Sequence, residues 1–161
     1  MAAQSRFGGI GRALQHRNYR YYWMGGAVSI LGFWLHKLAL GWLTWDLTHS
    51  PFWLGIIGFS ATFVTAIIAP FAGAVADRYG LRKTAFIALS CSSANAMTIA
   101  VVTFNGAMTV ELLVVLTLLQ GITLSFDLPA RQALVHHIVD REDLSAAIAL
   151  NTTTFHVGAF I

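Results

Sequence analysis

Charged side chains are scarce in this sequence. Lys, Arg, Asp and Glu make up only 11% of the 161 residues, whereas a soluble domain carries about 25% because its surface must face water. Hydrophobic residues make up 57% of the chain. This balance excludes an ordinary water-soluble globule and predicts an integral membrane protein in contact with a lipid bilayer.

Cysteine is almost absent as well. Cys91 is the single cysteine, so the chain contains neither an intrachain disulfide nor a cysteine metal site. The neighbours His136 and His137 have no further residues that would complete a metal site. We find no nucleophile paired with a base and no glycine-rich phosphate loop. The sequence therefore predicts neither an enzyme nor a bound cofactor. The basic residues form no stripe of the kind that binds nucleic acid.

Long uncharged runs are what the chain has in abundance. A helix needs about 20 mostly apolar residues to cross the hydrocarbon core, and membrane strands alternate apolar with polar residues, which Leu112–Leu119 does not. The sequence predicts an all-α, polytopic transmembrane helix bundle that follows an N-terminal segment, residues 1–18. The five predicted spans are Tyr19–Trp45, Phe52–Ala76, Thr84–Phe104, Val110–Leu128 and Leu144–Ile161.

The basic residues are segregated along the chain. Nine of the ten lie at or before the start of the first span, between the second and third, or between the fourth and fifth, and the connections 46–51 and 105–107 contain none. The positive-inside rule therefore places residues 1–18 in the cytoplasm. Asp140 and Asp143, which precede the fifth span, are expected to cap it. Small residues such as Gly25, Gly32 and Gly73 are expected to let neighbouring helices approach closely.

The connection between the second and third spans carries an ordered set of small and charged residues. Gly80 permits a tight turn with positive φ, and Asp77 can cap or face a helix N-terminus. The simpler alternative is an ordinary short cytoplasmic loop with a turn glycine, and loop chemistry alone does not separate the two. The residues of the set are Gly73, Asp77, Arg78, Gly80, Arg82 and Lys83.

This pattern, G-x-x-x-D-R-x-G-x-R-K, resembles the signature loop of the major facilitator superfamily, which lies between that family's second and third helices. The stretches 127–134 and 139–151 resemble the helix 4–5 connection of its drug and siderophore exporters, the enterobactin-exporter-like branch. The resemblance implies a twelve-helix fold whose two halves rock about a central cavity. Residues 19–161 then supply helices 1 to 5 of the N-terminal half, and the missing C-terminal helices are its partners.

The resemblance also implies a function, the export of a small amphipathic or siderophore-like molecule across a bacterial inner membrane. Two departures from the family pattern stand out. Many drug antiporters carry an arginine within the fourth helix, and Leu112–Phe126 contains none, which counts against proton-coupled drug export. The family's Gly-Pro-containing stretch near residue 161 is absent as well.

Lys37 is the one basic residue in the interior of a predicted span, where a charge costs about 2.5–3.5 kcal/mol on insertion scales. Trp34 shares its helix face, and the adjacent His36 is expected to be a packing residue. The lysine can snorkel to the outer interface, line a cavity or form an internal ion pair, and the sequence leaves these alternatives open.

Asp127 lies near the cytoplasmic end of the fourth span, at the level of Arg131. It belongs either to a cytoplasmic gate with the nearby arginines or to a solvated helix end just before a predicted break at Pro129.

Two functions of different class remain. One is the secondary transporter implied by the resemblance. The other is a small four- or five-span membrane partner or assembly subunit without transport activity of its own. The coding sequence downstream of codon 161 separates them, because a transporter frame continues with seven more spans.

Overall fold

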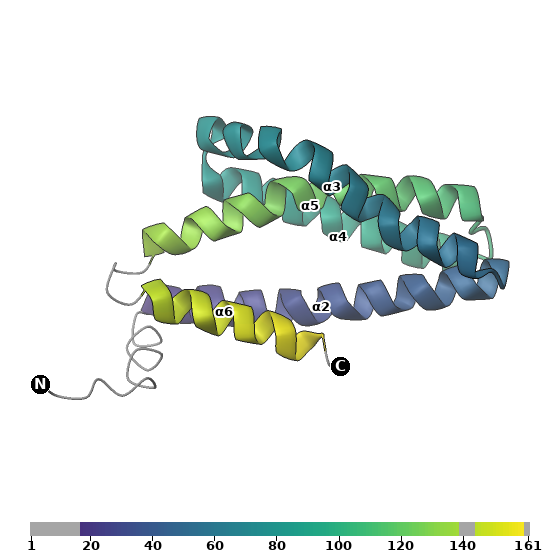
Figure 1. The fold of residues 1–161 in the computed structure, drawn as a ribbon, viewed down its shortest axis with the longest axis horizontal. Helices are drawn as coiled ribbons and strands as arrows, with labels where there is room; N and C mark the ends of the chain where they lie inside the picture. Colours follow the sequence, from purple (N-terminus) through teal and green to yellow (C-terminus); the bar gives the residue numbers. More distant parts are fainter. Residues whose placement is uncertain (1–16, 139–143, 160–161) are drawn as a thin grey trace, which may run out of the picture. The chain divides into compact units, whose positions relative to one another are not determined.

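The computed structural model describes residues 17–138 and 144–159, and within these ranges the chain is helical almost throughout. Its elements are α2 (Arg17–Thr48), α3 (Pro51–Tyr79), α4 (Leu81–Phe104), α5 (Val110–Ile138) and α6 (Leu144–Gly158) (Figure 1). These ranges contain no strand, and the all-α prediction is confirmed. Most of the predicted segment 1–18 lies outside the described residues, as do Asp140 and Asp143.

Four of the helices are long and apolar enough to cross a membrane, in agreement with the first four predicted spans. They are Tyr19–Thr48, Pro51–Tyr79, Leu81–Phe104 and Val110–Val135. The fifth predicted span begins with α6, which has 15 residues in the described range, against the roughly 20 that cross a hydrocarbon core. The chain is an integral membrane protein built of spanning helices.

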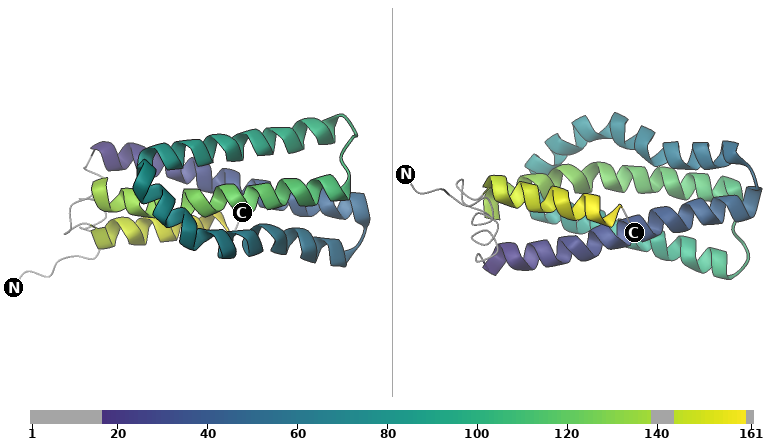
Figure 2. Two further views of the ribbon diagram at one scale, coloured as in Figure 1. Left: turned by 90° about the horizontal axis from the view of Figure 1, so that it is seen from above. Right: turned by 60° about the horizontal axis from the view of Figure 1, so that its bottom comes forward.

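The predicted break at Pro129 is wrong, because α5 continues through this proline to Ile138. A proline removes one backbone hydrogen bond, here to the carbonyl of Ser125. Ending the helix in an apolar environment would leave several N–H and C=O groups unpaired instead, at a larger cost. Pro70 lies inside α3 in the same way, and this helix bends in its second half (Figure 2).

The described helices divide into two compact units. The first unit combines α2 up to Lys37, the end of α5 from Ala133 and all of α6. The second unit contains the remainder of α2, α3, α4 and α5 up to Gln132.

The first unit is held by aromatic side chains from α2 that pack on α6. Tyr19 is fully buried with Val135 and Ala147, and its hydroxyl donates to the carbonyl oxygen of Ala147 at 3.1 Å. The indole N–H of Trp23 donates to the hydroxyl of Thr154 at 3.2 Å. Aromatic side chains of α2, each with one polar atom, therefore join α2 to α6.

The second unit is held by apolar packing and by a close helix crossing. Its buried cluster joins α3, α4 and α5 and consists of Ile57, Ile99, Met108, Leu113 and Leu116. At Gly121 an added Cβ would lie 2.6 Å from the carbonyl oxygen of Ala61, so α3 and α5 approach to a distance that a side chain does not allow. The hydroxyl of Thr65 lies 3.1 Å from the Gly121 carbonyl oxygen at this crossing.

Candidate functional site

The connection between α3 and α4 is a single residue, Gly80. Its φ of +95° confirms the predicted tight turn, since only glycine takes this conformation freely. The Gly80 N–H donates to the carbonyl oxygen of Ala76 at 3.0 Å, and its carbonyl accepts the N–H of Thr84 at 3.1 Å. Both helix ends are thus tied to one residue, which fixes the chain reversal.

The charges of the signature set lie on helix ends rather than in a loop. Asp77 and Arg78 occupy the last turn of α3, Arg82 and Lys83 the first turn of α4, and all four are exposed. Gly80 is the N-cap of α4 with no side-chain capping bond, so Asp77 does not cap this helix. In the part of the chain that is described, the carboxylate of Asp77 has neither a hydrogen bond nor an ion pair.

The small residue of the set, Gly73, is half-buried on α3. A Cβ added there would meet no atom within 4 Å, and the same is true of Gly25 and Gly32 on α2. The predicted close approaches at these positions are therefore not found within either unit.

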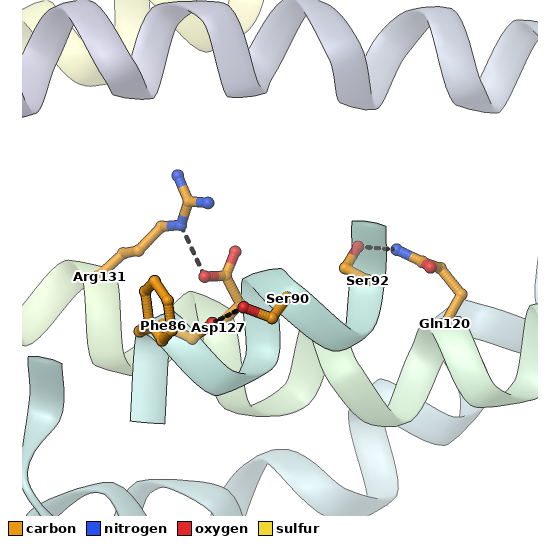
Figure 3. A network of polar contacts seen from close by, with 6 residues as sticks. All are labelled: Phe86, Ser90, Ser92, Gln120, Asp127 and Arg131. Atoms are coloured by element: carbon orange, nitrogen blue, oxygen red, sulfur yellow. Dashed lines mark hydrogen bonds and ion pairs between the residues drawn. The ribbon is translucent and has the colours of Figure 1, made fainter. Parts of the chain in front are cut away.

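Asp127 and Arg131 are brought together by the unbroken helix α5. The guanidinium Nε lies 2.7 Å from the carboxylate Oδ1, one turn apart, with the two side chains 25% and 14% exposed for Arg131 and Asp127 (Figure 3). Asp before Arg at this spacing is the favourable order on a helix. Arg78 and Arg82 make no recorded ion pair with Asp127 in the described ranges.

Next to this pair, α4 and α5 share a polar network that sequence reasoning missed. The amide nitrogen of Asn95 donates to the Leu116 carbonyl and to the side-chain oxygen of Gln120, both at 3.0 Å. The Gln120 amide then donates to the hydroxyl of Ser92 at 2.7 Å (Figure 3). The Leu116 carbonyl can only accept a hydrogen bond, so the nitrogen of the Asn95 amide must face it. The same nitrogen then faces the oxygen of the Gln120 amide, which fixes the orientation of both side chains. The sequence did offer a sign of this network, because Asn95 and Gln120 are polar amides within long uncharged runs.

Lys37 lies over an aromatic ring on its own helix. Its ammonium is 5.2 Å from the centre of the Trp34 ring, which confirms that the two residues share a helix face. The Trp34 indole N–H donates to the Phe155 carbonyl at 3.1 Å, and the Phe155 ring lies 5.4 Å away, centre to centre. The neighbouring His36 side chain is half-buried, and its Nε2 atom is buried without a hydrogen-bond partner. Packing this side chain therefore costs the free energy of an unpaired polar atom.

These groups are suited to holding helices and binding a ligand non-covalently. Across residues 17–138 and 144–159 no three His, Cys, Asp or Glu side chains lie where they could hold a metal ion. Four helices that are long and apolar enough to span a membrane, two of them joined by a one-residue turn with charged residues on either side, define a polytopic membrane protein.

Residues 12–159 match the family described as transmembrane secretion effector, a branch of the major facilitator superfamily, and the chain belongs to this family. The predicted superfamily is therefore confirmed. The chain is also similar to the Staphyloferrin A transporter of Staphylococcus aureus (strain NCTC 8325 / PS 47), with 23% identity over 139 residues. That match covers 86% of this chain and 35% of the relative, so the chain spans about a third of the relative's length. No solved structure matches.

Both comparisons point to transport rather than to an enzyme, in agreement with the sequence-based expectation.

Proposed function

We propose that this chain forms the first five membrane helices of a secondary transporter that exports a small amphipathic or siderophore-like molecule by alternating access. The observation that carries the proposal is the family match over residues 12–159, which includes the charged turn between α3 and α4. The name of the Staphylococcus aureus relative supports a siderophore-like substrate. Further helices complete the central cavity, because about a third of the relative's length corresponds to this chain.

The signature turn acts in this proposal as a contact that changes between conformations. Asp77 is exposed at the end of α3 and has no partner among the described residues. Its carboxylate is therefore available to a helix of the second half of the transporter. Asp127 and Arg131 form the cytoplasmic gate of the same proposal, and Lys37 with Trp34 lines the cavity.

The N-terminus is cytoplasmic in this arrangement, and the membrane is a bacterial inner membrane. Arg17 and Arg20 lie at the start of α2, and three basic residues lie on the helix ends on either side of Gly80. The connections 49–50 and 105–109 carry none. Short loops with Lys and Arg remain in the cytoplasm.

The orientation is tested by cysteine labelling in intact cells. Cys91 is exposed and free, so it is first replaced by serine. An impermeant maleimide should label Ser50→Cys and leave Tyr79→Cys unlabelled until the cells are opened. Labelling of Tyr79→Cys in intact cells would reverse the orientation.

Transport is tested in a siderophore-producing bacterium that lacks its own exporter. One strain expresses the complete reading frame that contains this segment, and a second expresses residues 1–161 alone, at equal membrane levels. We expect secreted siderophore only from the first strain. Secretion by neither strain contradicts the siderophore-exporter proposal, and secretion by the 161-residue chain alone contradicts the need for further helices.

A further inference from the structure

We propose that Lys37 and Trp34 form a subsite at the middle of the bilayer that binds the anionic group of an amphipathic organic anion. The aromatic rings of Phe33 and Phe155 then contact the apolar body of that molecule. The inference rests on the proposed transport function and adds to it the charge and the chemical class of the substrate.

The depth of the site follows from the span alone. The candidate span runs from Tyr19 to Thr48, and Trp34 lies halfway along it. This position is the same whichever end of the helix faces the cytoplasm. Transporter binding sites lie near the bilayer midplane.

The direction of the lysine side chain decides between the alternatives that the sequence left open. Eleven residues, about 16 Å of helix, separate Lys37 from the nearer span end at Thr48. A snorkelling lysine would extend toward that end. Side chains on a helix instead lean toward its N-terminus, and the ammonium of Lys37 lies over Trp34, one turn in that direction. The charge is therefore held toward mid-span.

The charge of Lys37 is only partly compensated there. The Trp34 ring face attracts a cation, but no carboxylate pairs with Lys37 within residues 17–138 and 144–159. An ammonium has three N–H donors, and a ring face occupies one side of it. An intramembrane cation without a counter-charge is costly, so an anion that enters this site is bound strongly.

The aromatic side chains around the ammonium are fixed before a ligand arrives. The Trp34 N–H is engaged by the Phe155 carbonyl, which orients the ring. Phe33 packs against Trp34 with 5.6 Å between ring centres and against Phe155 with 6.2 Å. Phe155 is 39% exposed, and Lys37 is exposed as well. Since all four residues come from α2 and α6 of the first unit, this chain contains the whole subsite.

The experiment compares three naphthalene probes of equal shape and different charge. The full 161-residue chain is placed in phosphatidylcholine nanodiscs, and binding of 1-naphthoate, neutral 1-naphthamide and cationic 1-naphthylmethylammonium is measured by equilibrium dialysis against empty nanodiscs. We expect naphthoate to bind about tenfold more tightly than naphthamide, the effect of one charge-assisted hydrogen bond. The cationic probe should bind most weakly.

Variants assign the effect to the subsite. Lys37→Met should lower naphthoate affinity to that of naphthamide without changing naphthamide binding, and Lys37→Arg should keep the preference. Arg20→Met is the matched control, since Arg20 lies 6.0 Å from the Tyr21 ring on the same helix but near the end of the span. Circular dichroism checks that each variant keeps its helices.

Equal affinity of the wild-type chain for naphthoate and naphthamide would overturn the proposal, as would equal effects of Lys37→Met and Arg20→Met. A parallel measurement in phosphatidylglycerol nanodiscs separates a lipid headgroup from a substrate anion. Naphthoate binding that persists there supports the substrate, and its loss assigns the site to anionic lipid and contradicts the inference. The secretion experiment fails or succeeds independently, so a wrong subsite and a wrong transport function give different results.

Discussion

The two units of the chain hold their helices together with different chemistry. In the first unit, aromatic rings of α2 lie on α6, and three hydrogen bonds between these helices start from the Tyr19 hydroxyl and from the indole N–H groups of Trp23 and Trp34. In the second unit, paired amides and a glycine crossing join α4 and α3 to α5.

This difference separates a scaffold from the binding surface that we propose. The amides of Asn95 and Gln120 lie within spans and use each other as partners, so little polar capacity is left for a ligand. Lys37 in the first unit keeps ammonium donors that no described residue accepts. In lipid, where apolar burial does not drive helix association, an unmatched polar group is the stronger indication of function.

The largest expected effect on stability lies at the glycine crossing of the second unit. Gly121→Leu places side-chain atoms against the backbone of Ala61, which cannot move without displacing α3, so we expect a loss of about 3 kcal/mol. Unfolding in mixed micelles with increasing dodecyl sulfate, followed by circular dichroism, measures it.

Substitutions at two other glycines serve as comparisons for Gly121→Leu. At Gly158 in the first unit, an added Cβ meets the side chains of Trp34 and Ile30, which can shift, so Gly158→Leu should cost about 1 kcal/mol. Gly55→Leu, where an added Cβ meets nothing within 4 Å, is the control and should be neutral. Equal losses at Gly121 and Gly55 would show that the crossing does not hold the unit together.

The amide network should give the next largest effect. Asn95→Leu removes two inter-helix hydrogen bonds, and since such bonds in membranes average about 0.6 kcal/mol we expect a loss of about 1 kcal/mol. The double variant with Gln120→Leu should cost less than the sum of the single variants, because the partners disappear together. Strict additivity in the same unfolding titration would contradict the network.

A smaller effect is expected in the first unit. Tyr19→Phe keeps the buried ring but removes the hydroxyl that donates to Ala147, at a cost of about 0.5–1 kcal/mol. Tyr21→Phe is the matched control, since Tyr21 is 59% exposed, and it should leave the unfolding midpoint unchanged. A Tyr19→Phe protein as stable as this control would mean that rings alone hold α2 on α6.

Local sequence signals predicted the spans and the turn. Long apolar runs with few charges predicted the first four spans, and a glycine between charged residues predicted the positive φ at Gly80. Partners distant in sequence were not predictable in this way. The importance of Gly121 and Asn95 depends on the residues that face them, on α3 and α5 respectively. Gly73 was predicted from its motif, but a Cβ added there meets no atom within 4 Å. The helix break predicted at Pro129 was wrong because a proline's tendency to end a helix is weaker than the need to pair backbone N–H and C=O groups in lipid.

The smallest effect on stability, and a large one on transport, is expected at the signature turn. Asp77 is exposed and has no described partner, so Asp77→Asn should change the unfolding free energy by less than about 0.5 kcal/mol. In the protein encoded by the complete reading frame, the same change removes the charge that we propose contacts the second half. Export should then fall by about tenfold, the effect of one charge-assisted hydrogen bond.

Asp46→Asn is the control for this variant. Asp46 is also exposed, but it lies near the end of α2, outside the signature set. Siderophore secretion per transporter in the membrane should fall for Asp77→Asn and not for Asp46→Asn, with both proteins inserted at equal levels. Equal secretion by the two variants would make Asp77 a solvated helix-end residue. The contrast between a stabilising second unit and a ligand-binding first unit would then stand without a gating role for the α3–α4 turn.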